Sequence, residues 1–206
     1  MIADKLELAN SGRVPPSRQR ASSSDTRRHI LEAAQALFSE AGYEQTSIED
    51  IVSRSGVSVG SIYHQIGGKA AIFREVATLV IAEQARASRT AVAEALSSGE
   101  SDAVALYLHG ATAYLMSSWK NRQVSRVILS DDRPTGSTGV QQELESRMIA
   151  GTRDIVLGDP PTQELSSAAV IALLRTGSEQ LIDVTDEQTA EAIVRYYIGL
   201  LQRLAS

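Results

Sequence analysis

Between Thr46 and Lys69 the chain concentrates side chains whose chemistry is hydrogen bonding to an outside partner. The stretch after Gly56 offers small or polar groups, one aromatic hydroxyl and one imidazole in place of bulky packing residues. These residues are Ser58, Val59, Gly60, Ser61, Tyr63 and His64. A short helix with such an uncluttered face is what the major groove of DNA admits. The segment therefore predicts a DNA-binding helix-turn-helix.

Several of these residues have an expected contact. Val59 and Ser61 are expected to approach base edges, Val59 through apolar contact with a thymine methyl. Gly60 lets the backbone come close to the DNA. Thr46 and Ser47 stand at the start of a helix, where hydroxyls and free N–H groups suit a phosphate, although both residues can also serve as caps alone.

Two interpretations stay open for each of the remaining residues. Tyr63 is expected to donate its hydroxyl to a phosphate, the alternative being a packing role in the core. His64 contacts a base or a phosphate, or else is a solvated surface residue. Arg27, Arg28 and Arg54 are basic residues near this segment, and they either contact flanking phosphates or are simply exposed.

Three short helices must position this surface. Apolar residues from Ile30 to Ala41 recur at helical spacing, which predicts an amphipathic helix from Asp25 that ends at Gly42. The pattern Thr46-x-x-Glu49 predicts a capping box for the second helix, and Ser58 can cap the third. The expected core consists of Leu37, Phe38, Ile48, Ile51, Val57 and Ile62.

The rest of the chain also predicts helices. A long helix is expected from Lys69 to about Leu96, with Ile72, Phe73, Val76, Leu79 and Val80 on its buried side. Further helices are expected at about 101–118, 121–130, 140–157, 162–183 and 186–204, the last opened by a Thr185-x-x-Gln188 capping box. No segment shows a sustained period of two, so we expect an all-α fold.

Charge is divided unevenly along the 206 residues. Residues 1–80 contain nine Lys and Arg against nine Asp and Glu, whereas residues 81–206 contain eleven against sixteen and account for the whole net charge of −5. Residues 13–28 alone carry +4. Residues 1–24 have little apolar periodicity after Asn10 and predict a flexible basic arm, which either touches DNA or is inert.

Composition argues against several other classes of protein. No stretch approaches ~18 uninterrupted apolar residues, so no membrane span is expected, and the first residues lack the pattern of a secretory signal. The absence of cysteine agrees with a cytoplasmic protein. Paired carboxylates at 131–132 and at 143 and 145 have no base partner at a recognisable spacing, and the three histidines form no metal motif. We therefore expect no enzyme, no metal and no cofactor.

An ordered set of residues between Ile30 and Lys69 resembles the tetracycline-repressor (TetR) family of bacterial transcription regulators. The set comprises Ala33-Ala34, Leu37-Phe38, Gly42-Tyr43, Thr46, Ile48, Ile51, Gly56-Val57-Ser58, Gly60, Tyr63 and Lys69. The resemblance implies that Lys69 contacts a phosphate. It also implies an N-terminal three-helix domain at 25–70, joined by the long helix to a larger helical ligand-binding and dimerisation domain at 71–206.

The chain departs from the family pattern just before Lys69. Gln65 and Ile66 stand where the family usually has an aromatic residue or His and then Phe, and Gly67-Gly68 lacks the usual polar cap. Gln65 can still donate to a phosphate through its amide. Ile66 fills less volume than Phe, so a looser seat for the long helix is expected.

A homodimer is expected because one short recognition face discriminates few base pairs, and two-fold pairing onto half-sites is the usual solution. The resemblance places the interface on the last two helices. Their close-packing residues include Ala168, Ala172, Ile193, Tyr197 and Leu201, and some of this set must instead belong to the core of a single chain.

The effector site is the least determined part of the sequence. The polar or aromatic residues most able to line a cavity between helices are Tyr107, His109, Tyr114, Met116, Trp119 and Arg175, with core packing as the alternative for each.

The function that we expect is a ligand-responsive transcriptional regulator, a repressor released from a palindromic operator in double-stranded DNA by an unidentified small molecule. One alternative is a regulator controlled by a partner protein and lacking a small-molecule pocket; an all-α enzyme is a remote one.

Overall fold

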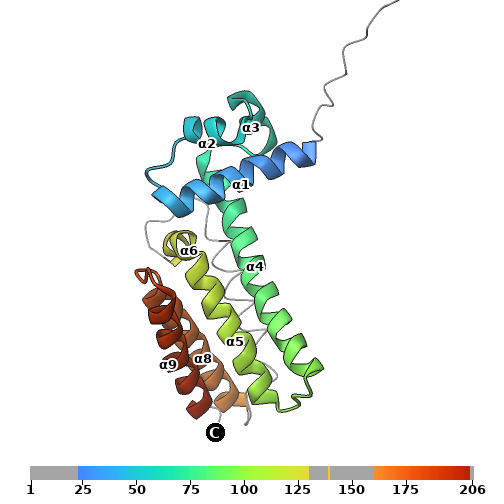
Figure 1. Ribbon diagram of the computed structural model, residues 1–206, viewed down its shortest axis with the longest axis vertical. Helices are drawn as coiled ribbons and strands as arrows, with labels where there is room; N and C mark the ends of the chain where they lie inside the picture. The colour runs from blue at the N-terminus through green and yellow to red at the C-terminus, as the bar shows by residue number, and fades with distance from the viewer. Residues whose placement is uncertain (1–22, 130–138, 140–159, 205–206) are drawn as a thin grey trace, which may run out of the picture.

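The computed structural model describes residues 23–129, 139 and 160–204, and all regular structure within them is helical (Figure 1). This agrees with the predicted all-α class. The helix predicted at 140–157 and the paired carboxylates between 131 and 145 lie outside the described residues. So does the predicted arm, except for Ser23 and Ser24, which already belong to the first helix.

Three helices form the N-terminal bundle: α1 (Ser23–Ala41), α2 (Ile48–Ser55) and α3 (Val59–Gln65). Their predicted core is confirmed. Phe38, Ile51 and Ile62 are at most 1% exposed, and the other three predicted residues pack partly buried against them. Gly42 follows α1 with φ of 85° and Gly56 caps α2 with φ of 68°, a backbone region that favours glycine.

The start of α2 differs from the prediction by one residue. Ser47, not Thr46, is the N-cap, and its partner in the capping box is Asp50. Thr46 is 3% exposed, and its hydroxyl donates to the Gly42 carbonyl oxygen at 2.8 Å. Thr46 therefore fixes the turn after α1, and the next residue caps the helix.

The helix α4 (Lys69–Ser97) runs from the N-terminal bundle along the whole second half of the molecule (Figure 1). Four of the five residues predicted on its buried side are 0% exposed, but Leu79 is 47% exposed. The buried stripe continues instead through Ala77, Val80, Ile81 and Gln84, and Leu79 falls outside it. The prediction for Leu79 is therefore wrong.

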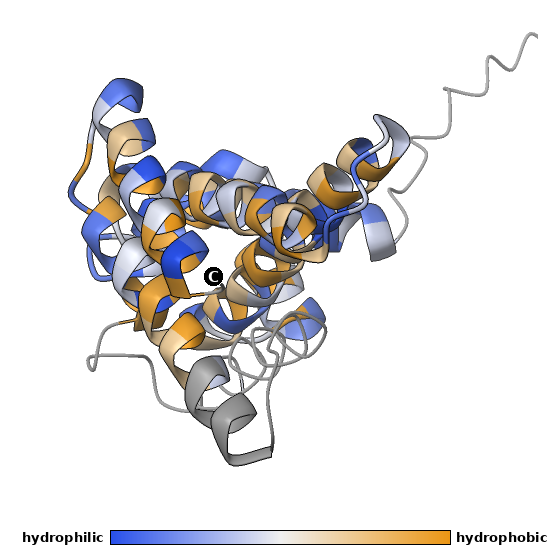
Figure 2. Ribbon diagram, turned by 90° about the horizontal axis from the view of Figure 1, so that it is seen from below, coloured by the Kyte–Doolittle hydropathy of each residue, from blue (hydrophilic) through white to orange (hydrophobic). Residues whose placement is uncertain are grey.

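The remaining described helices are α5 (Ala103–Lys120), α6 (Arg122–Leu129), α8 (Pro160–Leu181) and α9 (Glu187–Leu204). In this half α5 packs antiparallel to α4 on one side and against α8 and α9 on the other. Viewed from below, many of the apolar residues turn toward the interior (Figure 2). No described helix is long and apolar enough to cross a membrane.

The cap of α9 is also shifted by one residue. The predicted box at Thr185 and Gln188 does not open this helix, which begins at Glu187. The Thr189 N–H donates instead to the Asp186 carboxylate at 2.8 Å, and this bond lowers the pKa of Asp186. Asp186 caps better because an ionised carboxylate is a stronger acceptor at a helix N-terminus than a hydroxyl.

Candidate nucleic-acid interface

The predicted recognition helix α3 presents its outer face at the end of the molecule farthest from the C-terminus (Figure 1). Val59 is 46% exposed and Tyr63 is 57% exposed. A Cβ added at Gly60 would meet no atom within 4 Å, so the backbone there is open to close approach. His64 is exposed on the same helix.

The start of α3 is held by a serine pair. The Ser58 side chain accepts from the Ser61 N–H at 3.3 Å, which confirms the predicted cap, and its Oγ donates to the Ser61 Oγ at 3.0 Å. Since Ser61 accepts in this pair, its own hydroxyl proton stays available for an outside acceptor. Ser58 therefore acts as the cap, and contact of Ser61 with a base edge stays a prediction.

The start of α2 already holds a negative charge. Asp50 accepts from the Ser47 N–H at 2.8 Å and from its hydroxyl at 2.6 Å, and these bonds lower the pKa of the Asp50 carboxyl. Ser47 therefore has the capping role that the sequence left open, whereas the Thr46 hydroxyl is bonded to the Gly42 carbonyl oxygen in the preceding turn. A phosphate contact by either residue stays a prediction.

Lys69 is neither solvated nor free. Its ammonium donates to the carbonyl oxygens of Tyr43 at 2.8 Å and Glu44 at 3.3 Å, and lies 4.2 Å from the centroid of the Tyr43 ring. Tyr43 in turn packs on Phe38 and Phe73, with ring centroids 5.6 and 5.1 Å away. The start of α4 is thereby tied to the turn between α1 and α2, a role that the sequence did not reveal.

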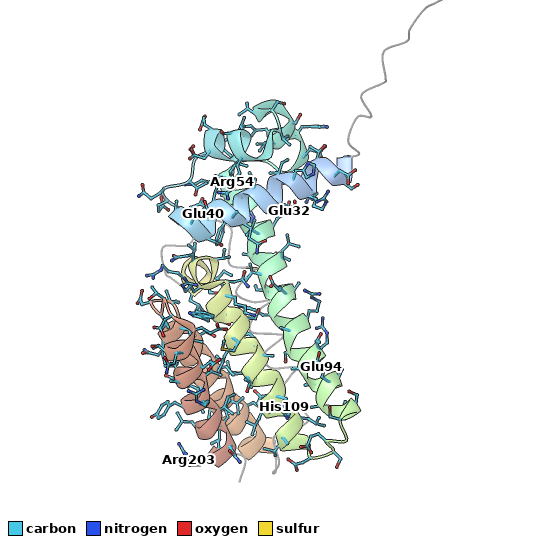
Figure 3. The ribbon with its side chains drawn as sticks, in the orientation of Figure 1. Glu32, Glu40, Arg54, Glu94, His109 and Arg203 are labelled. Atoms are coloured by element: carbon cyan, nitrogen blue, oxygen red, sulfur yellow. The ribbon has the colours of Figure 1, made fainter. Side chains whose placement is uncertain are left out.

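The three arginines predicted to flank the interface all have carboxylate partners. Arg28 lies 3.0 Å from Glu32 and 3.9 Å from Asp25. Arg54 donates to both carboxylate oxygens of Glu40, at 2.5 and 2.7 Å, where α1 ends beside α2 (Figure 3). This pairing lowers the pKa of Glu40.

The third arginine, Arg27, pairs with Glu75 of α4 at 2.6 Å. Phosphate contacts by the three arginines stay predictions, and such contacts would have to compete with these ion pairs.

Gln65 turns toward α1. Its Oε1 accepts from the Ser23 hydroxyl at 2.9 Å. Ile66 packs partly buried against the core, and a looser seat for α4 stays a prediction. Gly68 is the N-cap of α4 and makes no side-chain cap bond, as the sequence predicted.

Comparisons with known proteins agree with this geometry. Residues 30–76 match the model of a family described as bacterial regulatory proteins, tetR family. The N-terminal segment of the chain belongs to the TetR family. The match covers most of the three-helix bundle and the start of α4, including the whole of α3.

Two curated relatives are similar to a segment of this chain. The HTH-type transcriptional regulator AcrR of Shigella flexneri is 40% identical over 52 residues, 25% of this chain and 24% of that protein. The HTH-type transcriptional repressor KstR2 of Rhodococcus jostii is 32% identical over 62 residues, 30% of each protein. The alignments thus span less than a third of either relative.

Solved structures extend the likeness of fold to most of the chain. A putative TetR-family transcriptional regulator from Mesorhizobium loti superposes with a TM-score of 0.69 at 19% identity, covering 89% of this chain and 96% of that one. Another from Syntrophomonas wolfei gives 0.64 at 20% identity, covering 88% and 95%. This chain therefore has the TetR-family fold beyond the matched domain.

In the C-terminal half of the chain, two of the predicted effector residues come together. Tyr114 hydrogen-bonds with Ser118 and Ser178, and burial raises its pKa. Burial and the neighbouring Tyr114 raise the pKa of Tyr107. The Tyr107 hydroxyl is buried without a hydrogen-bond partner, the one such side-chain atom among the described residues.

The other four effector candidates lie apart from this pair. Met116 is partly buried against the core, and the Trp119 indole N–H donates to the Val184 carbonyl oxygen at 2.9 Å. His109 is exposed on α5 (Figure 3), and Arg175 is exposed and lies 3.0 Å from Glu179. His109 and Arg175 thus lie on the surface among the described residues, and a contact of either with an effector stays a prediction.

A buried polar layer near Tyr114 was missed by the sequence analysis. The Gln84 amide donates to the Ser118 hydroxyl at 3.2 Å, and the Ser178 hydroxyl lies 3.3 Å from the same oxygen. All three residues are at most 4% exposed. The available signal was Gln84 itself, a polar residue in phase with the apolar stripe of α4.

The predicted dimer face is only partly available. Ala168 and Ala172 are exposed, and Ile193 and Tyr197 are half-buried. Leu201 is 2% exposed and belongs to the core of the single chain, so its assignment to the interface is wrong. An open groove of about 570 Å³ runs along this face, lined by Gln180, Gln188, Thr189, Ala192, Ile193, Tyr196 and Tyr197.

Proposed function

We propose that the protein is a DNA-binding transcriptional regulator that acts as a homodimer, represses transcription and is released from its operator by a small molecule. The outer face of α3 carries this proposal. Val59 and Tyr63 are about half exposed around a glycine whose backbone is open, on a helix that Ser58 caps firmly. An apolar and an aromatic side chain exposed together on one short helix suit a partner that covers them.

Double-stranded DNA is the partner that fits this face. Val59 offers an apolar contact for a thymine methyl, Ser61 offers a hydroxyl, and Tyr63 reaches outward with its phenol. The matched relatives are described as HTH-type transcriptional regulators, one of them a repressor. Their alignments cover 25% and 30% of this chain, and the family model matches residues 30–76, the region that contains the face.

Dimerisation would use the surface of α8 and α9. Tyr196 is 63% exposed and borders the groove, and Ala168 and Ala172 leave room for a close helix contact. An aromatic beside small residues suits the centre of a protein interface. Two copies joined there would each project one α3 toward a half-site of a palindromic operator.

Response to an effector would act through α4, which belongs to both halves of the molecule. The buried Tyr107 hydroxyl without a partner supports a ligand in the C-terminal half, because such a group is costly unless something bonds it. A ligand that prefers one position of α4 would shift the separation of the two reading helices.

Selection of bound sequences from a random DNA pool tests the proposal, first alone and then with a panel of small molecules. Enrichment of an inverted repeat supports a dimeric DNA reader, whereas no enrichment at low salt overturns it. Saturable release by one compound supports the effector mechanism. If every compound that binds the protein leaves its DNA affinity unchanged, the effector mechanism fails while the DNA reader stands.

A further inference from the structure

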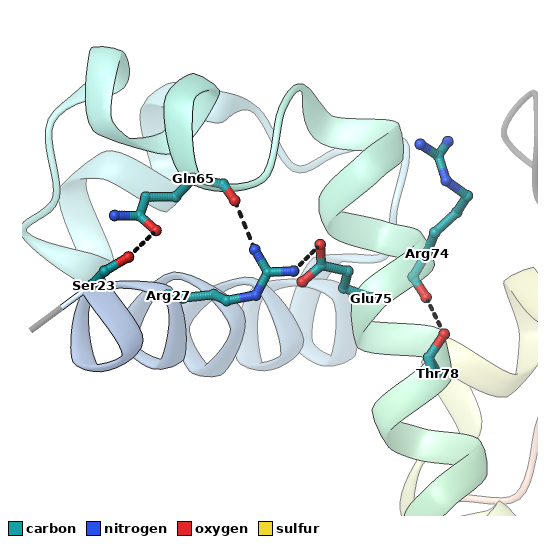
Figure 4. A network of polar contacts seen from close by, with 6 residues as sticks. All are labelled: Ser23, Arg27, Gln65, Arg74, Glu75 and Thr78. Carbon is teal, nitrogen blue, oxygen red and sulfur yellow. Dashed lines mark hydrogen bonds and ion pairs between the residues drawn. The ribbon is translucent and has the colours of Figure 1, made fainter.

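One arginine of α1 contacts both α3 and α4. Arg27 Nη1 donates to the backbone carbonyl oxygen of Gln65 at 2.6 Å, and its Nη2 lies 2.6 Å from the carboxylate of Glu75 (Figure 4). Gln65 is the last residue of α3, and Glu75 lies in the second turn of α4. The guanidinium therefore bridges the end of the recognition helix to the helix that enters the C-terminal half.

The backbone between α3 and α4 includes two glycines, which add no side-chain contacts to fix the joint. Gly67 has φ of 118°, and Gly68 makes no side-chain cap bond. The last carbonyls of a helix lack partners within the helix and attract cations. Arg27 satisfies one such carbonyl in α3 and adds an ion pair to α4. Ser23 of α1 adds a second contact to the end of α3, since its hydroxyl donates to the Gln65 side chain.

We propose that Arg27 is a positioning residue for DNA binding, which fixes the end of α3 relative to α4 through Glu75. A shift of α4 is then transmitted to the exposed face of α3 through Arg27 as well as through Gly67 and Gly68. The inference rests on the proposed function, since it assumes that α3 reads DNA.

A direct contact between Arg27 and a phosphate makes the opposite prediction for Glu75. If Arg27 touched phosphate, removing the competing carboxylate would strengthen binding to the polyanion. If Arg27 acts by position, removing Glu75 weakens DNA binding even though a negative charge has been taken away. The sign of the Glu75→Ala effect therefore separates the two roles.

The experiment compares Glu75→Ala with Glu40→Ala, using DNA selected by the unaltered protein. Each change removes one acidic partner of an arginine, but the Glu40 pair stays within the three-helix bundle. Alanine keeps helix propensity at both sites. We expect Glu75→Ala to weaken DNA binding about 3- to 10-fold, the range for a partly exposed ion pair with a charged hydrogen bond, and Glu40→Ala not to weaken it. Tighter or unchanged binding by Glu75→Ala overturns the proposal.

The double variant Arg27→Ala/Glu75→Ala adds a second test. It should bind DNA no more weakly than Arg27→Ala alone, because Glu75 acts only through Arg27, and additive losses would contradict the bridge. The salt dependence should also stay the same in Arg27→Ala. A slope reduced by about one would instead assign a phosphate contact to Arg27.

Hydrogen exchange tests the bridge without DNA. The N–H groups of Ile66 and Gly67 both donate to the Ile62 carbonyl oxygen at the end of α3, at 3.0 and 3.2 Å. We expect these two amides to exchange faster in Glu75→Ala and at the original rate in Glu40→Ala. Unchanged exchange in Glu75→Ala overturns the bridge. If the unaltered protein selects no DNA, the proposed function fails, and this measurement still decides the bridge.

Discussion

The ammonium of Lys69 lies 2.8 Å from the carbonyl oxygen of Tyr43 and 4.2 Å from the centroid of the same tyrosine's ring. The first residue of α4 is thereby fastened to the turn that follows α1. Tyr43 is itself wedged against Phe38 and Phe73, so this contact connects the start of α4 to the core of the three-helix bundle.

Replacing Lys69 with alanine should therefore destabilise the protein as well as weaken DNA binding. The change removes two charged hydrogen bonds and a cation–π contact at a half-buried site, so we expect a loss of about 1 kcal/mol in the free energy of unfolding. Urea denaturation measures it. The matched control is Lys120→Ala, at an exposed lysine that ends α5, which should change stability by less than about 0.5 kcal/mol. Equal losses in both variants would contradict the role of Lys69 in fastening the turn.

The capping box of α2 should make stability depend on pH. Hydrogen bonds from Ser47 hold the pKa of Asp50 below its ordinary value of 3.8. A lowered folded-state pKa gives stability that is present above the unfolded pKa and is lost as the pH falls through the folded pKa. Asp50→Asn should therefore be less stable than the unaltered protein at pH 7, and the difference should shrink as the pH drops below about 4. Urea midpoints at pH 7 and pH 3 test this. A gap that is constant with pH would assign the effect to packing.

Local patterns predicted the helices well but placed two caps one residue too early. Thr46 stands next to Ser47, and Thr185 next to Asp186, so each site offers two neighbouring residues able to cap. The spacing rule does not choose between them. The choice depends on which residue adopts extended backbone, as Ser47 does with φ of −101° and ψ of 167°.

The partners of the arginines could not be predicted for a different reason. Arg54 pairs with Glu40 and Arg27 with Glu75, residues 14 and 48 positions away that only tertiary packing brings together. The exposed face of α3 was predictable because it depends on local spacing alone. The buried layer at Gln84 and Ser118 joins two helices, and sequence periodicity carries no information on such pairing.

Removing the Ser61 hydroxyl should change which DNA sequences are preferred. Ser61→Ala keeps the backbone N–H that the Ser58 cap requires, so α3 should stay folded. If the hydroxyl contacts a base edge, preference at one or two base positions should change by about 1–3 kcal/mol. Sequencing of DNA selected by each protein gives the comparison. Identical base preferences would exclude Ser61 from base recognition.

The exposed aromatic of α9 offers a test of the dimer. Tyr196 is 63% exposed beside the groove, and Tyr196→Ser should weaken self-association by about 2 kcal/mol if this side chain is buried between two copies. Sedimentation equilibrium measures the dissociation constant. Leu79→Ser is the control, because Leu79 is 47% exposed on α4, outside the α8 and α9 surface. A dimer weakened equally by both changes would argue against the α9 face.

Gly177 lies where α8 packs against α5 and α9, and alanine there should destabilise the C-terminal half. A Cβ at this position would lie 3.1 Å from Leu115 Cδ2 and 3.2 Å from Tyr197 Cγ, tighter than ordinary van der Waals contact. Because Gly177 is buried, the neighbours must move apart, at a cost of about 1–3 kcal/mol.

Gly199→Ala in α9 is the matched control, since the nearest atom to its added Cβ is Arg203 Nη1 at 3.8 Å. That change should stabilise the protein by about 0.5–1 kcal/mol, because glycine inside a helix costs entropy on folding. Urea denaturation measures the free energy of unfolding, which should fall in Gly177→Ala and rise in Gly199→Ala. Since Tyr197 borders the groove of the proposed dimer face, Gly177→Ala should also weaken self-association. A loss of stability in Gly199→Ala as large as that in Gly177→Ala would contradict the close packing at Gly177.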